Sequence, residues 1–314
     1  MMAIALSGCA LAQAQSYPDK PLKLVVPYPP GASADASARL ISQKASALLG
    51  QPVVIDNRSG ASGNIGTEYV ARQPADGYTF QLGTDATHAA NTHLVAKPTF
   101  NPLKDFTPLA LAAMNPVVLV VNPSVPANTL KDYVEGVRSG KIQGAFGSSG
   151  TGSPHQLAGE LLKSRTGAPL VHVPYRGGGP AVTDVLGGQI PAVFASVITV
   201  LPYIQAGKLR ALAVTDAKRY PGLPQVPTIA ETYEGFNVPS WLAFFGPAKL
   251  PEPVAQRLSA AIRGAVEDPE VKTKLDAMGL VVPADTSPKA LAELQHRDFE
   301  LKGKIIRDAG IQIE

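Results

Sequence analysis

The sequence predicts an α/β protein made of two lobes. From Leu22 onward, short apolar runs of strand length alternate with helix-length segments, which is typical of βαβ units on a mostly parallel sheet. The 29 glycines and 29 prolines follow no collagen-like period and lie between the apolar runs, so they indicate many short loops. Two extended segments, 115–122 and 238–246, are candidate crossings between the lobes, and two crossings form a hinge.

Composition excludes several classes of protein. The chain has 314 residues, 45% of them hydrophobic, which is enough for one large or two medium domains. Its formal net charge is +3, and only 17% of its residues are charged. The chain therefore lacks both the basic excess of a nucleic-acid-binding protein and the core-poor composition of a disordered one. After the N-terminus, no apolar stretch approaches the roughly 20 residues of a membrane span.

Residues 1–14 are predicted to be a secretory signal peptide that lacks the usual basic start. The segment carries no charged side chain and ends in Ala12-Gln13-Ala14, an A-x-A cleavage pattern. It contains Cys9, the only cysteine, so the folded part has no disulfide and no cysteine-based metal or redox chemistry. Two alternatives stay open. One is a lipid anchor at Cys9, whose surroundings resemble a lipobox, and the other is a disordered apolar N-terminus of a cytosolic protein.

The predicted elements follow in order, and the crossings divide them into lobes. Residues 15–117 and 242–314 are expected to form lobe 1, and residues 118–241 lobe 2. In lobe 1 we expect strands at 22–27, 53–56 and 78–83 and helices at 34–49 and 66–72. In lobe 2 we expect strands at 116–121, 142–147, 170–173, 192–195 and 209–215 and helices at 130–139, 154–166 and 180–186. Helices at 253–267, 269–278 and 288–308 follow, each beginning beside a proline, which a first helical turn tolerates.

The most informative loop joins a strand that ends at Gly147 to a helix that begins at Pro154. Ser153 is placed to cap this helix, with Gln156 completing a capping box. Such a junction directs free backbone N–H groups at one point in front of the helix dipole, and so predicts an anion site. The alternative is an ordinary turn that needs glycine for its geometry. The candidate ligand-binding residues here are Ser148, Ser149, Gly150, Thr151, Ser153 and His155.

A similar junction follows the first strand, where a Pro/Gly loop leads into an amphipathic helix. Tyr28 lies in this loop and is placed to lie flat against a ligand. Asp35 either accepts a hydrogen bond from a ligand or holds the helix N-terminus. The candidate ligand-binding residues here are Tyr28, Gly31, Ala32, Ser33, Ala34 and Asp35.

Two further loops follow predicted strands. Residues 83–88 supply the candidates Thr84 and His88, and residues 175–180 supply Arg176. Ligands of open α/β sheets bind outside the C-terminal ends of the strands, so four loops from two lobes can converge on one cleft. Arg176 either pairs with an anionic ligand or is an exposed surface arginine.

Several kinds of chemistry lack their motifs. The histidines show no metal-ligand spacing, and the glycine run at 60–66 is not the G-x-G-x-x-G of a dinucleotide site. No serine has the G-x-S-x-G frame of a nucleophile elbow. We therefore expect no metal and no cofactor. A secreted α/β hydrolase that uses Ser148 or Ser149 with His155 stays as a remote alternative.

Ordered motifs run along nearly the whole chain from Tyr17 to Gly310. They are YPDKPL at 17–22, VVPY at 25–28 with Gly31 and Asp35, GQPVV at 50–54, NR at 57–58 with Gly60, GNIG at 63–66, ADGYT at 75–79, GSSG at 147–150, VHVPYRG at 171–177, GGQ at 187–189, AGKLRALAV at 206–214 and VPT at 226–228. Each is weak alone, but together they are specific. With them the chain resembles the solute-binding proteins of the tripartite tricarboxylate transporter family, the Bug-type receptors.

The resemblance implies a periplasmic, monomeric, two-lobed protein with the type II periplasmic binding protein (Venus flytrap) fold. Such a protein catalyses nothing. It captures a small solute, mostly an organic anion, and presents it to the permease subunits of the transporter. In that family the loops corresponding to 28–35 and 148–153 hold carboxylate oxygens through backbone N–H groups, hydroxyls and bridging waters. A sensory accessory that delivers the same ligand signal to a two-component sensor is the second possibility.

Three departures from the family pattern bear on the ligand. Ala32 and Ala34 replace a glycine and a threonine of the first loop, which makes the pocket wall more apolar. His155 stands one position earlier than the usual histidine. Where many relatives carry Phe-Asp, this chain has alanine at 195 followed by the candidate ligand residue Ser196. The lost carboxylate favours a mono- or dicarboxylate over an amino acid.

Overall fold

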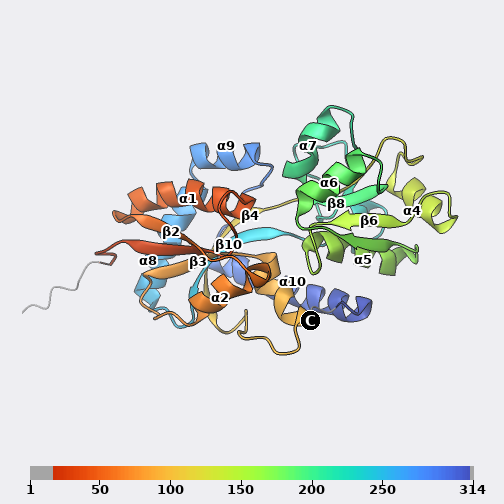
Figure 1. Ribbon diagram of the computed structural model, residues 1–314. Coiled ribbons are helices and arrows are strands. Elements are labelled where there is room, and N and C mark those ends of the chain that lie inside the picture. Colours follow the sequence, from red (N-terminus) through yellow and green to blue (C-terminus); the bar gives the residue numbers. More distant parts are fainter. Residues whose placement is uncertain (1–16, 312–314) are drawn as a thin grey trace, which may run out of the picture.

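The computed structural model describes residues 17–311, which form two lobes side by side (Figure 1). The predicted signal peptide at 1–14, with Cys9, lies outside the described residues. Lobe 1 contains a five-stranded sheet in the order β2-β1-β3-β10-β4. Its strands are β1 (Leu22–Val26), β2 (Val53–Asn57), β3 (Thr79–Thr84), β4 (Phe106–Met114) and β10 (Trp241–Pro247).

Lobe 2 repeats this arrangement with a sheet in the order β7-β6-β8-β5-β9. Its strands are β5 (Val117–Val121), β6 (Ala145–Ser148), β7 (Val171–Pro174), β8 (Ala192–Ser196) and β9 (Arg210–Val214). In each sheet one strand runs against the other four, because β10 pairs antiparallel with β3 and β4, and β5 with β8 and β9. These two strands begin directly after the crossings between the lobes. The predicted two-lobed α/β fold is therefore confirmed.

Helices cover both sheets, and most were expected from their periodicity. They are α1 (Ser33–Leu49), α2 (Asn64–Ala71), α3 (Asn91–Leu94), α4 (Leu130–Arg138), α5 (Pro154–Thr166), α6 (Gly178–Leu186), α7 (Val197–Gln205), α8 (Glu252–Val266), α9 (Pro269–Ala277) and α10 (Pro288–Ala309), with short turns η1 (Ala61–Gly63), η2 (Ala86–Ala90) and η3 (Ile229–Glu231). The sequence analysis did not predict β4, α3 or α7. The α7 segment is rich in β-branched residues and holds Pro202, which masks its helical period.

The last helix, α10, contacts both lobes. It lies against β4 of lobe 1 and against α5 of lobe 2 (Figure 1). Near its end, Ile305 and Ile306 are buried in the core cluster of lobe 2 together with Leu157 and Leu162. The boundaries predicted at 117/118 and 241/242 stay predictions, with α10 shared between the lobes.

The two crossings meet at a hydrogen-bonded pair. The backbone N–H of Asn115, just after β4, donates to the carbonyl of Ser240, just before β10, at 2.8 Å. Below this pair, Lys302 of α10 is fully buried between two carboxylates, Asp85 at 2.5 Å and Asp298 at 2.8 Å. Lys302 also donates to the carbonyl of Pro239 at 3.1 Å. This buried charge cluster joins the end of β3, the second crossing and α10.

Electrostatics keeps Lys302 charged inside the protein. Burial alone lowers the pKa of Lys302, but the attraction of Asp298 and Asp85 outweighs burial and leaves that pKa raised. Burial raises the pKa of Asp298, against the attraction of Lys302. The Trp241 indole N–H also donates to Asp298, at 2.8 Å. The cluster is therefore stable only while all its members are present.

Another carboxylate, that of the partly buried Asp216, lies close to the hinge. It lines an apolar cavity of about 280 Å³ that also includes Met114, Pro116 and Pro239. Asp216 Oδ2 is inaccessible to solvent and has no hydrogen-bond partner within residues 17–311. Burial raises the pKa of this carboxyl to about 7. Asp216 therefore favours its protonated form in the folded protein below about pH 7.

Replacing Lys302 by methionine is expected to lower the free energy of unfolding by about 3–5 kcal/mol, because two buried carboxylates lose their cation. Urea denaturation measures this change. The matched control is Lys304→Met on the same helix. Among the described residues, the exposed Lys304 pairs with the exposed Asp308 alone, and its replacement is expected to cost less than about 1 kcal/mol. Equal effects of the two substitutions would show that the buried cluster contributes no special stability.

Asp216→Asn is expected to stabilise the protein increasingly as pH rises from 4 to 8. In the unfolded chain the carboxyl ionises near its ordinary pKa of 3.8, whereas the folded protein holds its proton up to about pH 7. Wild-type stability therefore falls as pH rises through this window, and the amide avoids a loss of about 1–4 kcal/mol. Urea denaturation at several pH values measures the difference, with the exposed Asp276→Asn as control. A pH-independent difference contradicts the prediction.

Candidate functional site

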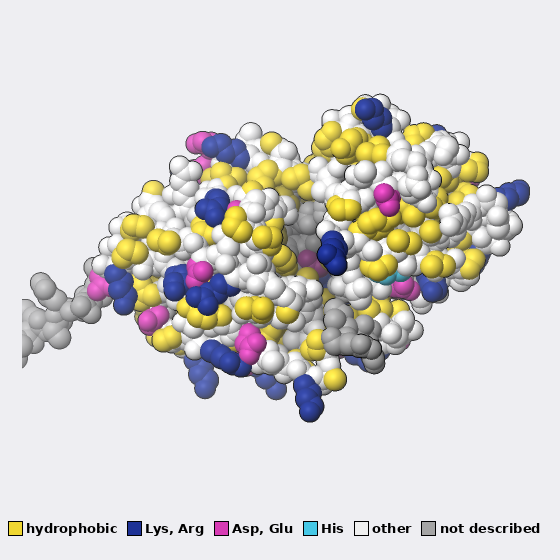
Figure 2. Space-filling view, in the orientation of Figure 1, with side chains coloured by type: hydrophobic (Ala, Val, Ile, Leu, Met, Phe, Trp, Pro, Cys, Tyr) yellow, Lys and Arg dark blue, Asp and Glu magenta, His cyan; other side chains and the backbone are white. Residues whose placement is uncertain are grey.

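The C-terminal ends of β1, β3, β6 and β8 face one another across the space between the lobes. A cavity of about 540 Å³ lies there, and the space-filling view shows the hollow between the lobes (Figure 2). From lobe 1 it is lined by Tyr28, Ser62, Ala86 and Asn91, and from lobe 2 by Ser149, Gly150, Thr151, Gly152, Ser153 and Pro154. None of these side chains is charged. Since strand ends at a junction of two α/β sheets are the usual place for a ligand, we take this cavity as the candidate site.

The lobe 2 loop between β6 and α5 is held in shape by its own hydrogen bonds. Gly150 and Gly152 adopt φ angles of 129° and 76°, which side chains other than glycine rarely tolerate. Ser153 caps α5, accepting from the N–H of Gln156 at 3.3 Å. The predicted capping box is wrong in one half, because the Gln156 side chain accepts from Gly152 N–H at 2.7 Å instead. This bond tightens the loop just ahead of the helix.

The same loop and the first turn of α5 contain unpaired backbone donors beside the cavity. The first N–H groups of any helix have no partner within the helix, and they carry the positive end of its dipole. Within residues 17–311, the backbone N–H groups of Thr151 and His155 have no backbone or side-chain acceptor. With Thr151 exposed in the cavity, the start of α5 has the properties of an anion-binding site.

His155 lies directly behind the loop, buried to 6% exposure. Its Nδ1 is 2.7 Å from Ser149 Oγ, and its Nε2 is 3.3 Å from Ser196 Oγ. Burial lowers the pKa of His155 to about 4, so the ring is neutral near neutral pH. His155 and Ser196 therefore form a second layer behind Ser149, which itself lines the cavity. Ser148 lies deeper still, bonded to Gly150 and to His172 Nε2 at 2.6 Å.

On the lobe 1 side, Tyr28 forms part of the cavity wall. Its hydroxyl is 2.8 Å from Thr84 Oγ1. Thr84 Oγ1 also accepts from the Thr87 N–H, and the Thr84 N–H donates to Thr87 Oγ1 in return. Burial raises the pKa of Tyr28 to about 12, so its hydroxyl stays protonated. Thr84 supports Tyr28 from behind and is not among the lining residues.

The first loop is organised by Asp35, whose carboxylate is buried. It accepts from the N–H of Gly31 at 3.0 Å, from Arg39 at 2.9 Å and from the amide of Asn57 at 2.9 Å. The Asn57 amide also donates to the carbonyl of Tyr28 at 3.0 Å. Asp35 thus holds the loop that carries Tyr28. None of the other first-loop candidates lines the cavity: Gly31, Ala32, Ser33 and Ala34.

Two further candidates lie elsewhere. His88 is fully buried in the core of lobe 1, stacked on Phe245 with ring centroids 3.8 Å apart, and burial lowers its pKa to about 3. The sequence predicted that His88 faces the cleft. It does not, because the chain turns into η2 at this point and carries the ring inward. Arg176 is exposed on the loop before α6 and does not line the cavity.

Three lobe 1 residues that line the cavity were not among the candidates: Ser62, Ala86 and Asn91. Ser62 belongs to the glycine run at 60–66 and adopts a left-handed φ of 55°. Asn91 donates to the carbonyl of Ser62 at 2.9 Å and to Asn64 Oδ1 at 2.8 Å, which holds the turn in place. The glycine run at 60–66 does not match a dinucleotide motif, but it is still a usable signal, because glycines indicate left-handed backbone and such backbone is common at ligand sites.

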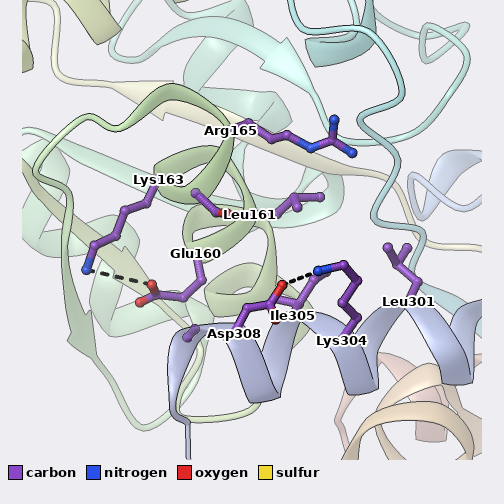
Figure 3. A pocket seen from close by; sticks show the side chains of 10 residues that line it. Glu160, Leu161, Lys163, Arg165, Leu301, Lys304, Ile305 and Asp308 are labelled. Carbon is purple, nitrogen blue, oxygen red and sulfur yellow. Dashed lines mark hydrogen bonds and ion pairs between the residues drawn. The ribbon is translucent and has the colours of Figure 1, made fainter.

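Another cavity, of about 490 Å³, lies between α5 and α10, away from the strand ends (Figure 3). Leu161, Leu301 and Ile305 line it together with charged groups that pair among themselves, such as Glu160 with Lys163 at 3.9 Å (Figure 3). It offers neither strand-end loops nor a helix N-terminus. Within residues 17–311 there is also no cluster of residues suited to hold a metal ion.

Two α/β lobes, two crossings and a cavity between them lined by uncharged side chains are features of a solute-binding protein of the two-lobed periplasmic type. Residues 37–311 match the tripartite tricarboxylate transporter family receptor, so the chain belongs to this family. The predicted family is thereby confirmed. The family consists of receptors and not of enzymes, which removes the support for a serine hydrolase.

Relatives and solved structures agree with this assignment. The chain is 33% identical to protein BugT of Bordetella pertussis over 314 residues, covering 99% of this chain and 96% of BugT. It superimposes on R. palustris Rpa4515 with adipate at a TM-score of 0.82 and 35% identity, covering 94% of this chain and 99% of the other. For MatC from Rhodopseudomonas palustris with bound malate the TM-score is 0.78 and the identity 31%, covering 92% and 100%.

Asp35→Ala is expected to lower the free energy of unfolding by about 1–3 kcal/mol, because the Gly31 N–H and the Asn57 amide lose their acceptor. Urea denaturation measures this, with Glu270→Ala as a control for an exposed acidic side chain. If stability stays unchanged while ligand binding is abolished, Asp35 contacts the ligand directly and our assignment of its role is wrong.

Proposed function

We propose that this protein captures a small organic anion, a mono- or dicarboxylate, in the cavity between its lobes. The observation that carries the proposal is the start of α5, where unpaired N–H groups and hydroxyls face a cavity without a charged side chain. Dipoles aimed at one point attract negative charge without any lysine or arginine. A carboxylate fits such a site because its oxygens only accept hydrogen bonds.

Two similar structures support this ligand class. Rpa4515 was solved with adipate and MatC with malate, and both anions are dicarboxylates. Ala195 supports it further, because an alanine stands where many relatives were expected to carry an aspartate. Without a carboxylate there, the cavity offers little to the ammonium group of an amino acid. We propose the loop residues Ser149, Gly150, Thr151 and Ser153 as ligand contacts, opposite Tyr28.

We further propose that the loaded receptor acts in the periplasm as a monomer and delivers its ligand to the permease subunits of a tripartite tricarboxylate transporter. Family membership supports this partner, and nothing in the composition favours nucleic acid. Among the described residues, no helix is long and apolar enough to cross a membrane. A two-component sensor is the alternative partner, and uptake of the ligand by a strain lacking this gene separates the two.

Adipate and malate are expected to raise the unfolding temperature of the protein after retained solute has been removed by partial unfolding and dialysis. A ligand that binds only the folded state adds about 2.7 kcal/mol at a concentration of about 100 Kd. Differential scanning fluorimetry measures the shift, with adipamide as the uncharged control.

Thr151→Glu is expected to weaken anion binding by at least about 10-fold through charge repulsion, whereas Thr183→Glu on exposed α6 leaves it unchanged. Stabilisation by sugars or cations but by no organic acid contradicts the proposal.

A further inference from the structure

A continuous series of hydrogen bonds runs from the cavity to the buried charge cluster at the hinge. From the cavity inward, Ser149 Oγ contacts His155 Nδ1 at 2.7 Å, and His155 Nε2 contacts Ser196 Oγ at 3.3 Å. The Asn115 amide then bridges Ser196 Oγ at 3.1 Å and Ser240 Oγ at 3.5 Å. Ser240 Oγ ends the series at Asp85 Oδ1, at 2.9 Å. We call these groups the Ser149–Asp85 relay.

The direction of the relay is set at its buried end. Asp85 is ion-paired with Lys302, and an ionised carboxylate can only accept hydrogen bonds. Ser240 must therefore use its single hydroxyl proton as the donor to Asp85. This leaves the Ser240 oxygen as an acceptor toward Asn115, which orients the amide with its NH2 group toward Ser240 and Ser196.

The same logic continues through Ser196 to His155. Within residues 17–311, the partners of Ser196 Oγ are Asn115 Nδ2 and His155 Nε2. Asn115 donates to Ser196, so among the described residues His155 Nε2 is the acceptor within reach of the Ser196 hydroxyl proton. The arrangement that gives this proton an acceptor leaves His155 Nε2 unprotonated. A neutral imidazole with a bare Nε2 carries its proton on Nδ1. His155 Nδ1–H therefore donates to Ser149 Oγ.

We propose that the Asp85–Lys302 ion pair fixes the His155 tautomer through this relay and thereby makes the Ser149 hydroxyl a hydrogen-bond donor to an anion in the cavity. Ser149 Oγ already accepts from His155, so its own proton is free to point into the cavity that it lines. The reverse tautomer would take that proton and leave Ser149 as an acceptor, suited to hydroxyl or ammonium ligands. This inference rests on the proposed function for its ligand class but not for the tautomer itself.

The relay also explains why the Ser149–His155 pair is not a nucleophilic dyad. A general base must receive the serine proton, and that requires an unprotonated nitrogen facing the hydroxyl. In the relay the facing nitrogen, Nδ1, is protonated and acts as a donor. His155 and Asn115 are therefore positioning residues that act through Ser149.

The direct test is the protonation state of the two His155 nitrogens in the ligand-free protein, read from long-range ¹H–¹⁵N correlation spectra at pH 7. The chain has five histidines, so the signals are assigned by comparison with His155→Asn. We expect a proton on Nδ1 and none on Nε2. A proton on Nε2, or a mixture of tautomers, overturns the inference, and no ligand is needed for the measurement.

Variants separate a directing role from a merely structural one. Asn115→Asp replaces the amide donor by an acceptor, so the relay is expected to reverse and the proton to move to Nε2. Ser196→Ala cuts the relay and is expected to give mixed tautomers, whereas Ser196→Thr retains the hydroxyl and the Nδ1–H form. If Asn115→Asp does not fold, the comparison of Ser196→Ala with Ser196→Thr still tests whether the relay fixes the His155 tautomer. A wild-type tautomer in Ser196→Ala overturns the inference.

Binding of adipate then links the tautomer to the ligand. Ser149→Ala is expected to weaken adipate binding by about 10- to 100-fold, the usual loss for one hydrogen bond to a charged group. Ser164→Ala, on the exposed face of α5, is the control and leaves affinity unchanged. Wild-type protein that fails to bind adipate while His155 shows the expected tautomer refutes the ligand and not the relay. Unchanged affinity in Ser149→Ala refutes the donor role of Ser149.

Discussion

Lys302 is the point where three distant parts of the chain meet. It contacts Asp85 at the end of β3, the carbonyl of Pro239 in the second crossing and Asp298 on α10. Each charge loses several kcal/mol of hydration on burial, so the cluster persists only where these contacts compensate that loss. The geometry of the hinge follows, because the first crossing pairs with the second at Asn115 and Ser240, one hydrogen bond away from Asp85.

The cavity depends on this hinge geometry, but no charged side chain is among the residues that line it. Its wall consists mainly of small, hydroxyl-bearing and aromatic residues. Its proposed donors are the N–H groups at the start of α5 and the hydroxyl of Ser149. Charged groups lie behind it, where Asp35 holds the loop of Tyr28 and Asp85 directs the relay. A ligand trapped there contacts both lobes, so binding favours the closed arrangement of the two lobes.

Local sequence predicts what depends on local physics. Alternating apolar runs located most strands and helices, and Ser153 followed by Pro154 identified the start of α5, where we propose an anion site. The remaining features depend on tertiary packing. The burial of His88 against Phe245, the part played by Asp35 in holding the first loop, and the shared position of α10 all involve residues far apart in the chain. Ser62 and Asn91 reach the cavity through a left-handed turn, and α7 was hidden because its residues favour strands when considered alone.

The central claim is that uncharged donors at the start of α5 bind a carboxylate between the lobes. A crystal structure of the protein with adipate tests it most directly. We expect one carboxylate of adipate within hydrogen-bond distance of the Thr151 N–H and of Ser149 Oγ, with the lobes closed over it. Adipate held by arginine or lysine side chains, or found in the groove between α5 and α10 while the cavity stays empty of anion, would contradict the claim.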